Sequence, residues 1–231
     1  MNLTNIIVGL VAPTGFWFAY HLYKDRHRPE PALNILLTYL LGIAAGWIGL
    51  RIYGALELLD LRYDAYALAE QSSIALFAYA VLVIGPVEEL VKFLPFWLVG
   101  IRFHDFDEPV DGIIYASFVA LGFATYENFL YLNYVQGAEL LARGFAAPLV
   151  HVMFASIWGY SCSRAQARGT SIPVAAAVGL AIAAFLHGLY DFIMIGLPPW
   201  CRPVSALLIL AIWIWRMHLI RRLTAKAGAG G

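Results

Sequence analysis

The sequence predicts an all-α integral membrane protein, a polytopic bundle of about seven transmembrane helices. Of its 231 residues, 61% are apolar and only 13% are charged, whereas a soluble domain carries about 25% charged residues. This excess of apolar side chains is too large for the core of one soluble domain, so the outer surface must be apolar as well. Seven separate segments are close to the length of about 20 apolar residues that a helix needs to cross the hydrocarbon core.

The predicted spans are residues 3–23, 32–53, 73–101, 110–135, 145–163, 172–196 and 204–220. The third span is long enough to tilt strongly or to kink at Pro86. The stretch 56–70 has mixed polarity and is expected to lie at the membrane interface as a short amphipathic helix. Gly42, Gly46 and Gly49 in the second span are expected to let helices approach closely.

The distribution of positive charge predicts how the helices are oriented. Ten lysines and arginines fall on one side of the seven-span topology and four on the other. The ten are Lys24, Arg26, Arg28, Arg102, Arg164, Arg168, Arg216, Arg221, Arg222 and Lys226, and the four are Arg51, Arg62, Arg143 and Arg202. Because positively charged loops stay in the cytoplasm, we expect the N-terminus outside and the C-terminus inside. The net charge of zero argues against a nucleic-acid partner, which needs a basic surface.

Ionisable and polar residues recur inside the predicted spans, where a charge is costly and therefore usually functional. They are Glu88, Glu89 and Lys92 in the third span, Glu127 and Asn128 in the fourth, His151 near the start of the fifth, and His187 and Asp191 in the sixth. On the predicted topology, all of them lie between the middle of the membrane and its outer leaflet. This agreement in depth predicts that four helices contribute to one site that opens toward the outside.

Helical spacing predicts which of these side chains share a face. Glu88 and Lys92 are four residues apart, so we expect them to pair, while Glu89 points toward the bundle interior. His187 and Asp191 are also four residues apart and project from one face.

Most of these groups also have a purely structural interpretation. Glu88 and Lys92 would then be a charge-neutral pair, His151 an interfacial histidine, and His187 with Asp191 a packing contact. Glu127 is harder to explain in this way, because no basic residue is near it in the sequence. An unpaired carboxylate in lipid must take up a proton or find a cation.

Carboxylates and histidines in one enclosed site are suited to hydrolysis. A glutamate can deprotonate water, and two histidines with a carboxylate are the usual ligands of a catalytic zinc. In a metal-free alternative, glutamate activates water directly and a histidine with Asp191 stabilises the oxyanion. The sequence contains neither H-E-x-x-H nor G-x-S-x-G, which excludes a zincin-type helix and a serine-hydrolase elbow. A proton- or cation-coupled transporter would use the same acids, and an inactive scaffold protein is the third class considered.

Three motifs resemble the signature of the PrsW intramembrane proteases. They are Glu88-Glu89-x-x-Lys92, Phe123-x-x-x-Glu127-Asn128 and His187-x-x-x-Asp191, extended by Asp111-Gly112 with Tyr115, by the Gly122-Phe123 pair, by Pro148-x-x-His151 and by His187-Gly188-x-Tyr190-Asp191-Phe192. The match covers residues 85–192, and the motifs occur in the order of the family. The distantly similar type II CAAX prenyl endopeptidases carry a histidine at the position of Glu127 and an asparagine at that of Asp191, so both positions favour the PrsW branch.

The resemblance implies a multi-pass protease of the bacterial inner membrane. It would cleave membrane-anchored proteins near the outer face, as in the site-1 cleavage of an anti-sigma factor. Its catalytic core would occupy about residues 80–195 of a single membrane domain, 1–224, followed by a disordered tail at 225–231.

The resemblance also implies roles for single residues. Glu88 and Glu89 are the candidates for activating water, with Glu89 favoured as base or ligand and Glu88 held by Lys92, or with these two roles exchanged. Residues expected to bind Zn²⁺ or to position water are Glu127, His151, His187 and Glu89. Asp191 would orient His187 or complete the site, with Tyr126, Asn128 and Tyr190 around it.

Overall fold

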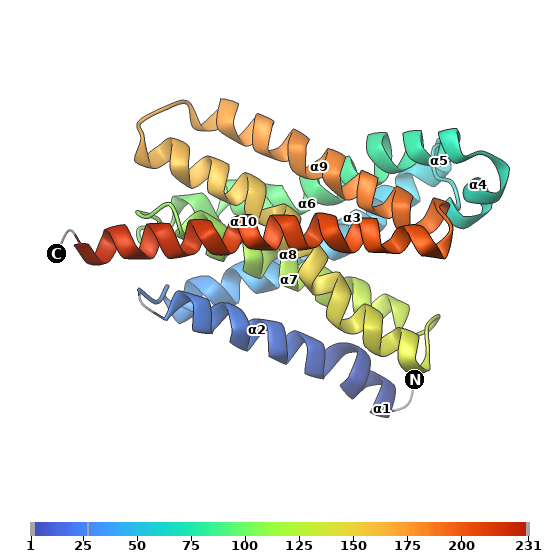
Figure 1. The fold of residues 1–231 in the computed structure, drawn as a ribbon, viewed down its shortest axis with the longest axis horizontal. Helices are drawn as coiled ribbons and strands as arrows, with labels where there is room; N and C mark the ends of the chain where they lie inside the picture. The colour runs from blue at the N-terminus through green and yellow to red at the C-terminus, as the bar shows by residue number, and fades with distance from the viewer. Residues whose placement is uncertain (1–2, 27, 230–231) are drawn as a thin grey trace.

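The computed structural model is an all-helical bundle that describes residues 3–26 and 28–229, with side chains described up to residue 223. Within these residues, seven helical segments are long and apolar enough to cross a membrane. They are Leu3–Asp25, Ala32–Leu58, Ser73–Arg102, Asp111–Tyr131, Gly137–Ala167, Ile172–Gly196 and Pro199–Leu223. The prediction of seven spans is confirmed. The first span begins at one end of the bundle and the last span ends at the other, as an odd number of spans requires (Figure 1).

Ten α-helices build these spans and the connections between them. They are α1 (Leu3–Ile6), α2 (Ala12–Asp25), α3 (Ala32–Leu58), α4 (Ala65–Gln71), α5 (Ser73–Tyr79), α6 (Gly85–Leu98), α7 (Asp111–Tyr131), α8 (Gly137–Ala167), α9 (Ile172–Gly196) and α10 (Arg202–Ala229). Helix α10 continues past residue 225, where a disordered tail was expected, and residues 230 and 231 lie outside the described part of the chain.

The third span changes its helical form just before Pro86. Between α5 and α6 the chain makes a π-helical turn, Ala80–Ile84, in which the N–H of Gly85 bonds to the carbonyl of Ala80, five residues back. Pro86 has no N–H to continue the regular pattern, which explains why the irregular turn lies here. Such turns are frequent at functional sites, and Glu88 follows within one helical turn.

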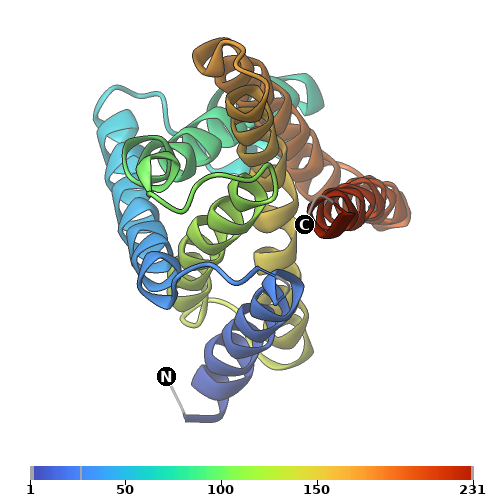
Figure 2. The same ribbon diagram turned by 90° about the vertical axis from the view of Figure 1, so that its left-hand side faces the viewer.

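Helix α7 is the centre of the bundle. Every residue from Asp111 to Ala124 is buried, because α7 packs against α2, α3, α6 and α8. Figure 2 shows α7 enclosed between α3 and α8, with α10 on the outside of the bundle. A helix covered on all sides is apolar all round, so its few polar residues stand out as candidates for function.

Glycines allow α3 and α7 to approach closely. A Cβ atom added to Gly42 would lie 2.0 Å from the carbonyl oxygen of Val119, and one added to Gly46 would lie 2.8 Å from Cβ of Tyr126. The predicted close approach is therefore confirmed at these two positions. At Gly49 the nearest atoms would be 3.6 Å away, which is an ordinary contact.

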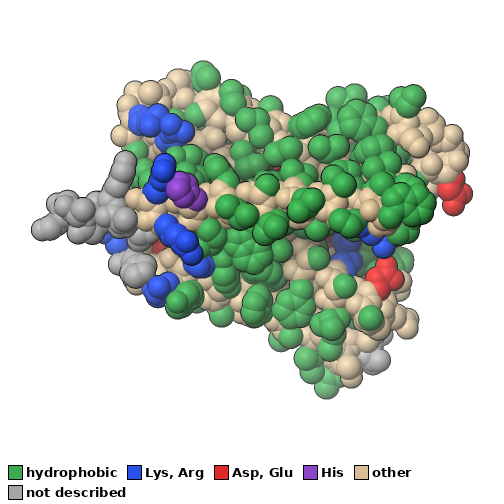
Figure 3. All heavy atoms as spheres, in the orientation of Figure 1, with side chains coloured by type: hydrophobic (Ala, Val, Ile, Leu, Met, Phe, Trp, Pro, Cys, Tyr) green, Lys and Arg blue, Asp and Glu red, His purple; other side chains and the backbone are tan. Residues whose placement is uncertain are grey.

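The outer surface is apolar, as the composition requires. Hydrophobic side chains cover most of the face seen in Figure 3, and lysines and arginines gather at the end where α10 finishes. Large exposed side chains such as Leu33, Leu82 and Ile74 are more than two-thirds exposed, and lipid is the solvent that tolerates this.

We expect Gly42→Ala to destabilise the fold by about 1–3 kcal/mol, the usual range for overpacking a buried contact. The reason is that the added methyl group meets backbone of α7 rather than a side chain that can turn away. Gly54→Ala on the same helix is the matched control, because a Cβ there meets nothing within 4 Å. Thermal unfolding of both variants in detergent measures the difference, and equal midpoints would contradict the packing described here.

Candidate active site

The site lies where α6, α7, α8 and α9 meet. The ionisable residues predicted for it fall into one connected network of contacts. They are Glu88, Glu89, Lys92, Glu127, His151, His187 and Asp191. The convergence predicted from their common depth is therefore confirmed, although several of the expected pairings are different.

Glu89 is completely buried and already has three donors. Its Oε1 accepts hydrogen bonds from Nζ of Lys92 at 2.5 Å and from Nδ1 of His187 at 2.8 Å. Its Oε2 accepts from the indole Nε1 of Trp158 at 2.9 Å. The predicted pairing of Glu88 with Lys92 is therefore wrong. Residues three apart share a helix face as well as residues four apart, and here Trp158 and His187 complete the polar surroundings on the Glu89 side.

Glu88 has the more open position of the two. One carboxylate oxygen accepts a hydrogen bond from the hydroxyl of Tyr53 at 3.4 Å, and the other lies 3.7 Å from Nε2 of His187. Neither contact is with a lysine or arginine. The alternative in which the two glutamates exchange their roles is therefore the one that the geometry favours.

His187 has a defined orientation. A carboxylate held by Lys92 can only accept hydrogen bonds, so Nδ1 of His187 donates its proton to Glu89. Nε2 consequently faces the centre of the site, 3.7 Å from an oxygen of Glu88 and 3.7 Å from Oδ2 of Asp191. This is the arrangement of a histidine whose second nitrogen is available to a ligand.

His151 is held between a donor and an acceptor. The ammonium group of Lys92 can only donate, so Nδ1 of His151 accepts from it at 3.0 Å. Nε2 then donates to Oε2 of Glu127 at 2.8 Å. The two imidazole rings of the site, His151 and His187, meet edge to face with centroids 5.2 Å apart.

Arg143 is a site residue that the sequence did not indicate. Its guanidinium binds Oε1 of Glu127 at 2.9 Å and lies over the ring of Tyr131, 3.3 Å from the centroid. The sequence analysis counted Arg143 as a charge of an outer loop, because it expected the fifth span to begin at residue 145. Helix α8 begins at Gly137, so Arg143 lies within it and His151 is in its middle rather than near its start.

Asn128 and Pro148 join α7 to α8 beside the site. Pro148 has no N–H, so the carbonyl of Gly144, four residues earlier, has no donor within its own helix. The side-chain Nδ2 of Asn128 donates to this carbonyl at 3.2 Å. This bond explains why both residues belong to the motif set, since it keeps Glu127 next to His151.

Aromatic side chains surround the network. Trp158 and Tyr53 donate hydrogen bonds to the two glutamates, and the sequence had no signal for them, because aromatic residues are common in membrane spans. Of the two tyrosines expected near the site, Tyr126 packs against α3. Tyr190 lies against Phe154, which in turn stacks on His187.

Asp111 and Tyr115 lie at the other end of α7, away from this network. Asp111 accepts hydrogen bonds from the backbone N–H groups of Asp107 and Glu108, and the hydroxyl of Tyr115 donates to Glu30. Burial, only partly offset by the hydrogen bond from Tyr115, raises the pKa of the Glu30 carboxyl to about 8. These residues hold loops onto the bundle.

Glu88, His151 and His187 form a group that suits a metal ion. Each offers one ligand atom, and these atoms all lie within 4.8 Å of one another. Two imidazole nitrogens and a carboxylate oxygen are the donor set of many catalytic zinc sites. The group contains Glu88 where the sequence analysis favoured Glu89, because Glu89 is already bound by three donors. Glu127, also expected among the ligands, contacts His151 and Arg143.

Comparison with known proteins identifies the family of the chain. The model of the PrsW family intramembrane metalloproteases matches residues 30–216. Proteins named Protease PrsW are similar over most of their length. That of Geobacillus kaustophilus is 30% identical over 212 residues, 90% of this chain and 88% of the relative. That of Clostridioides difficile is 30% identical over 225 residues, 95% and 87% of the two chains.

The protein of the same name from Bacillus subtilis is 26% identical over 223 residues, 96% of each chain. No solved structure gives a significant match. The family match includes all four helices that build the site. The chain therefore belongs to the PrsW family of intramembrane metalloproteases and is a multi-pass protease of the bacterial inner membrane.

Proposed function

We propose that this protease cleaves single-span membrane proteins near the outer face, as in the site-1 cleavage of an anti-sigma factor, with Glu88 as its central carboxylate. The observation that carries the proposal is the contrast between the two adjacent glutamates. Glu89 is saturated by three donors, whereas Glu88 faces His187 and has a carboxylate oxygen within 4.8 Å of a nitrogen of each histidine.

Glu88, His151 and His187 would hold a zinc ion, for which one nitrogen of His151 would exchange its contact with Lys92 or Glu127 for the metal. When bound, zinc would make a water molecule more acidic and polarise the carbonyl of the scissile peptide bond. The support for this ligand set is the chemistry of its donors and the close spacing of the three ligand atoms.

Glu89 would position His187, and Lys92 would hold Glu89 in place. Glu89 accepts the Nδ1 proton of His187 and so directs Nε2 into the site. Outer partners of this kind fix the tautomer and the ring orientation of metal-binding histidines. Asp191, 3.7 Å from Nε2 of His187, adds negative charge beside the ligand set.

Glu127 would be the general base. Its side chain is 23% exposed, against 13% for Glu88 and none for Glu89, so it is the most exposed of these glutamates. Arg143 compensates its charge. Glu127 would take a proton from the attacking water and deliver it to the leaving nitrogen. Arg143 would then face the negative charge that develops on the carbonyl oxygen.

The outer position of the cleavage follows from the predicted orientation. With the N-terminus outside, α7 and α9 run outward, and Glu127, His187 and Asp191 lie in the second half of these helices. The site is thus nearer to the outer leaflet than to the cytoplasm.

The two glutamates should respond differently to the same substitution. Glu88→Gln is expected to fold normally and to lose cleavage by at least about 100-fold, because a carboxylate ligand of the proposed zinc is lost. Glu89→Gln removes the counter-charge of Lys92, and an unpaired buried charge costs about 3–5 kcal/mol. Cleavage assays and thermal unfolding in detergent separate the two effects. Adding Lys92→Met to Glu89→Gln should recover part of the stability, and a stable Glu89→Gln single variant would contradict the assigned pairing.

Metal content tests the ligand set. The purified chain is expected to hold about one zinc per molecule, measured by elemental mass spectrometry. His187→Ala, His151→Ala and Glu88→Ala should each lose it, whereas Glu127→Gln should retain the metal and yet fail to cleave. An active preparation without metal would reject this ligand set and favour water activation by glutamate alone.

The substrate class is tested in vesicles. Tagged single-span proteins from the same bacterium, its anti-sigma factors included, are reconstituted with the protease, and new termini are identified by mass spectrometry. We expect cuts on the outer side of the span that disappear with Glu88→Gln. Cuts confined to the cytoplasmic side, or to soluble proteins, would be inconsistent with the proposal.

A further inference from the structure

Hydrogen bonds from the second half of helix α10 hold this helix against the bundle. Arg216 is fully buried, and its Nε donates to Oγ of Ser156 at 2.9 Å. Its Nη2 donates to Oγ of Ser117 at 3.0 Å and to Nδ1 of His21 at 3.3 Å. These bonds tie the second half of α10 to α2, α7 and α8.

The first half of α10 is held more weakly. Oγ of Ser205 contacts the thioether sulfur of Met194 in α9 at 3.1 Å, and sulfur of this kind is a weak acceptor. Ala206 lies about 15 Å along the helix from Arg216, at 1.5 Å per residue. The polar contact of this half with its neighbours is therefore weaker than those that Arg216 makes.

A groove of about 440 Å³ lies between this half of α10 and helices α8 and α9. Figure 3 shows the surface hollowed here, between α10 and the first half of α8. Small residues, Ala146, Ser205 and Ala206, form part of its wall, and Arg202 is the one charged residue that lines it.

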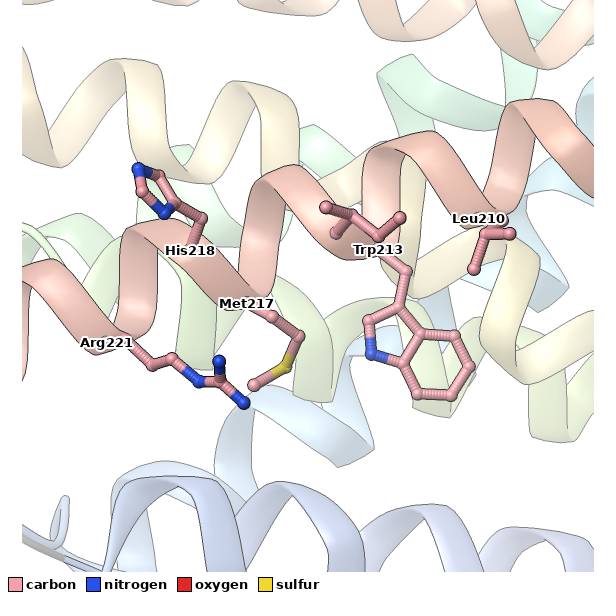
Figure 4. A pocket seen from close by; sticks show the side chains of 6 residues that line it. Leu210, Trp213, Met217, His218 and Arg221 are labelled. Atoms are coloured by element: carbon pink, nitrogen blue, oxygen red, sulfur yellow. The ribbon is translucent and has the colours of Figure 1, made fainter.

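A second groove lies along another face of α10. Figure 4 shows its lining residues Leu210, Trp213, Met217, His218 and Arg221 on successive turns of the helix. Leu210 and Trp213 line both grooves. The middle of α10 is therefore bordered by grooves on two sides.

The first groove is separated from the active site by two aromatic rings. Tyr190 and Val150 line it, and they directly precede Asp191 and His151 in the sequence. The ring of Phe154 lies 6.1 Å from the ring of Tyr190 and stacks on His187 at 5.0 Å, measured between centroids. A segment lying in the groove would thus be separated from His187 by these two rings.

We propose that this groove receives the transmembrane segment of the substrate, and that the first half of α10 moves outward to admit it from the lipid. The proposal rests on the proposed cleavage of membrane-anchored proteins. An almost uncharged wall suits an apolar segment and offers little to a soluble peptide, and small residues let another membrane helix approach closely. The groove as it stands has room only for side chains from one face of a helix. The first half of α10 must therefore move outward before the segment enters.

Crosslinking tests the occupant independently of cleavage. A photoreactive benzophenone is attached to Ala206→Cys or Leu207→Cys in the inactive Glu88→Gln chain, with Cys201→Ser to remove the accessible native thiol. Leu207 is 63% exposed to lipid and is the matched control. The probe is a peptide with an apolar Leu/Ala span of about 21 residues flanked by lysines, in vesicles of phosphatidylethanolamine and phosphatidylglycerol. We expect several-fold more peptide adduct from position 206. Equal adducts at both positions, or adducts with lipid alone at 206, would overturn the proposal.

A second measurement uses the active chain. Ala206→Trp fills the groove and is expected to lower the cleavage of a single-span substrate by about tenfold or more, whereas Leu207→Trp on the lipid side should stay close to wild type. An unchanged rate in Ala206→Trp overturns the proposal. If the wild type itself cleaves nothing, the proposed function fails, while the crosslinking result still decides what occupies the groove.

Discussion

The buried ion pair of Glu89 and Lys92 sets the geometry of the whole site. Both side chains are completely withdrawn from solvent, and such a pair is tolerated in a membrane only when hydrogen bonds satisfy its remaining groups. Here those bonds go to Trp158 and to the two histidines. Glu89 fixes the proton of His187 and Lys92 directs His151. One pair on α6 therefore orients both imidazoles, which belong to α8 and α9.

The number of spans and the convergence of the polar residues could be predicted because both depend on one-dimensional patterns. A membrane span is visible in the sequence as a run of apolar residues, and the bounds of α9, Ile172–Gly196, coincide with the prediction. The depth of a residue in the membrane follows from its position along the span. Seven ionisable side chains that agree in depth have few alternatives to meeting in one place, since each is costly when it faces lipid.

The pairings could not be predicted, because they depend on which side chains approach from other helices. Lys92 is within reach of both Glu88 and Glu89 along α6, and Trp158, which is 69 residues away from Glu89, completes the surroundings of only one of them. Arg143 was missed for a related reason. Its charge lowers the hydropathy of the first turns of α8, so the predicted span begins after it, although Glu127 compensates that charge within the bundle.

The active site and helix α10 have opposite physical requirements. The site needs side chains held in fixed positions, and α7 provides this through glycine contacts with α3 and through the bond from Asn128 to the carbonyl freed by Pro148. A protease whose substrates lie in lipid also needs a route into the site, and a rigid bundle would have none. Helix α10 lies outside the four helices that hold the site, so the proposed movement of its first half would leave the histidines in place. The strong bonds of Arg216 at one half and the weak Ser205 contact at the other are what such a division of roles requires.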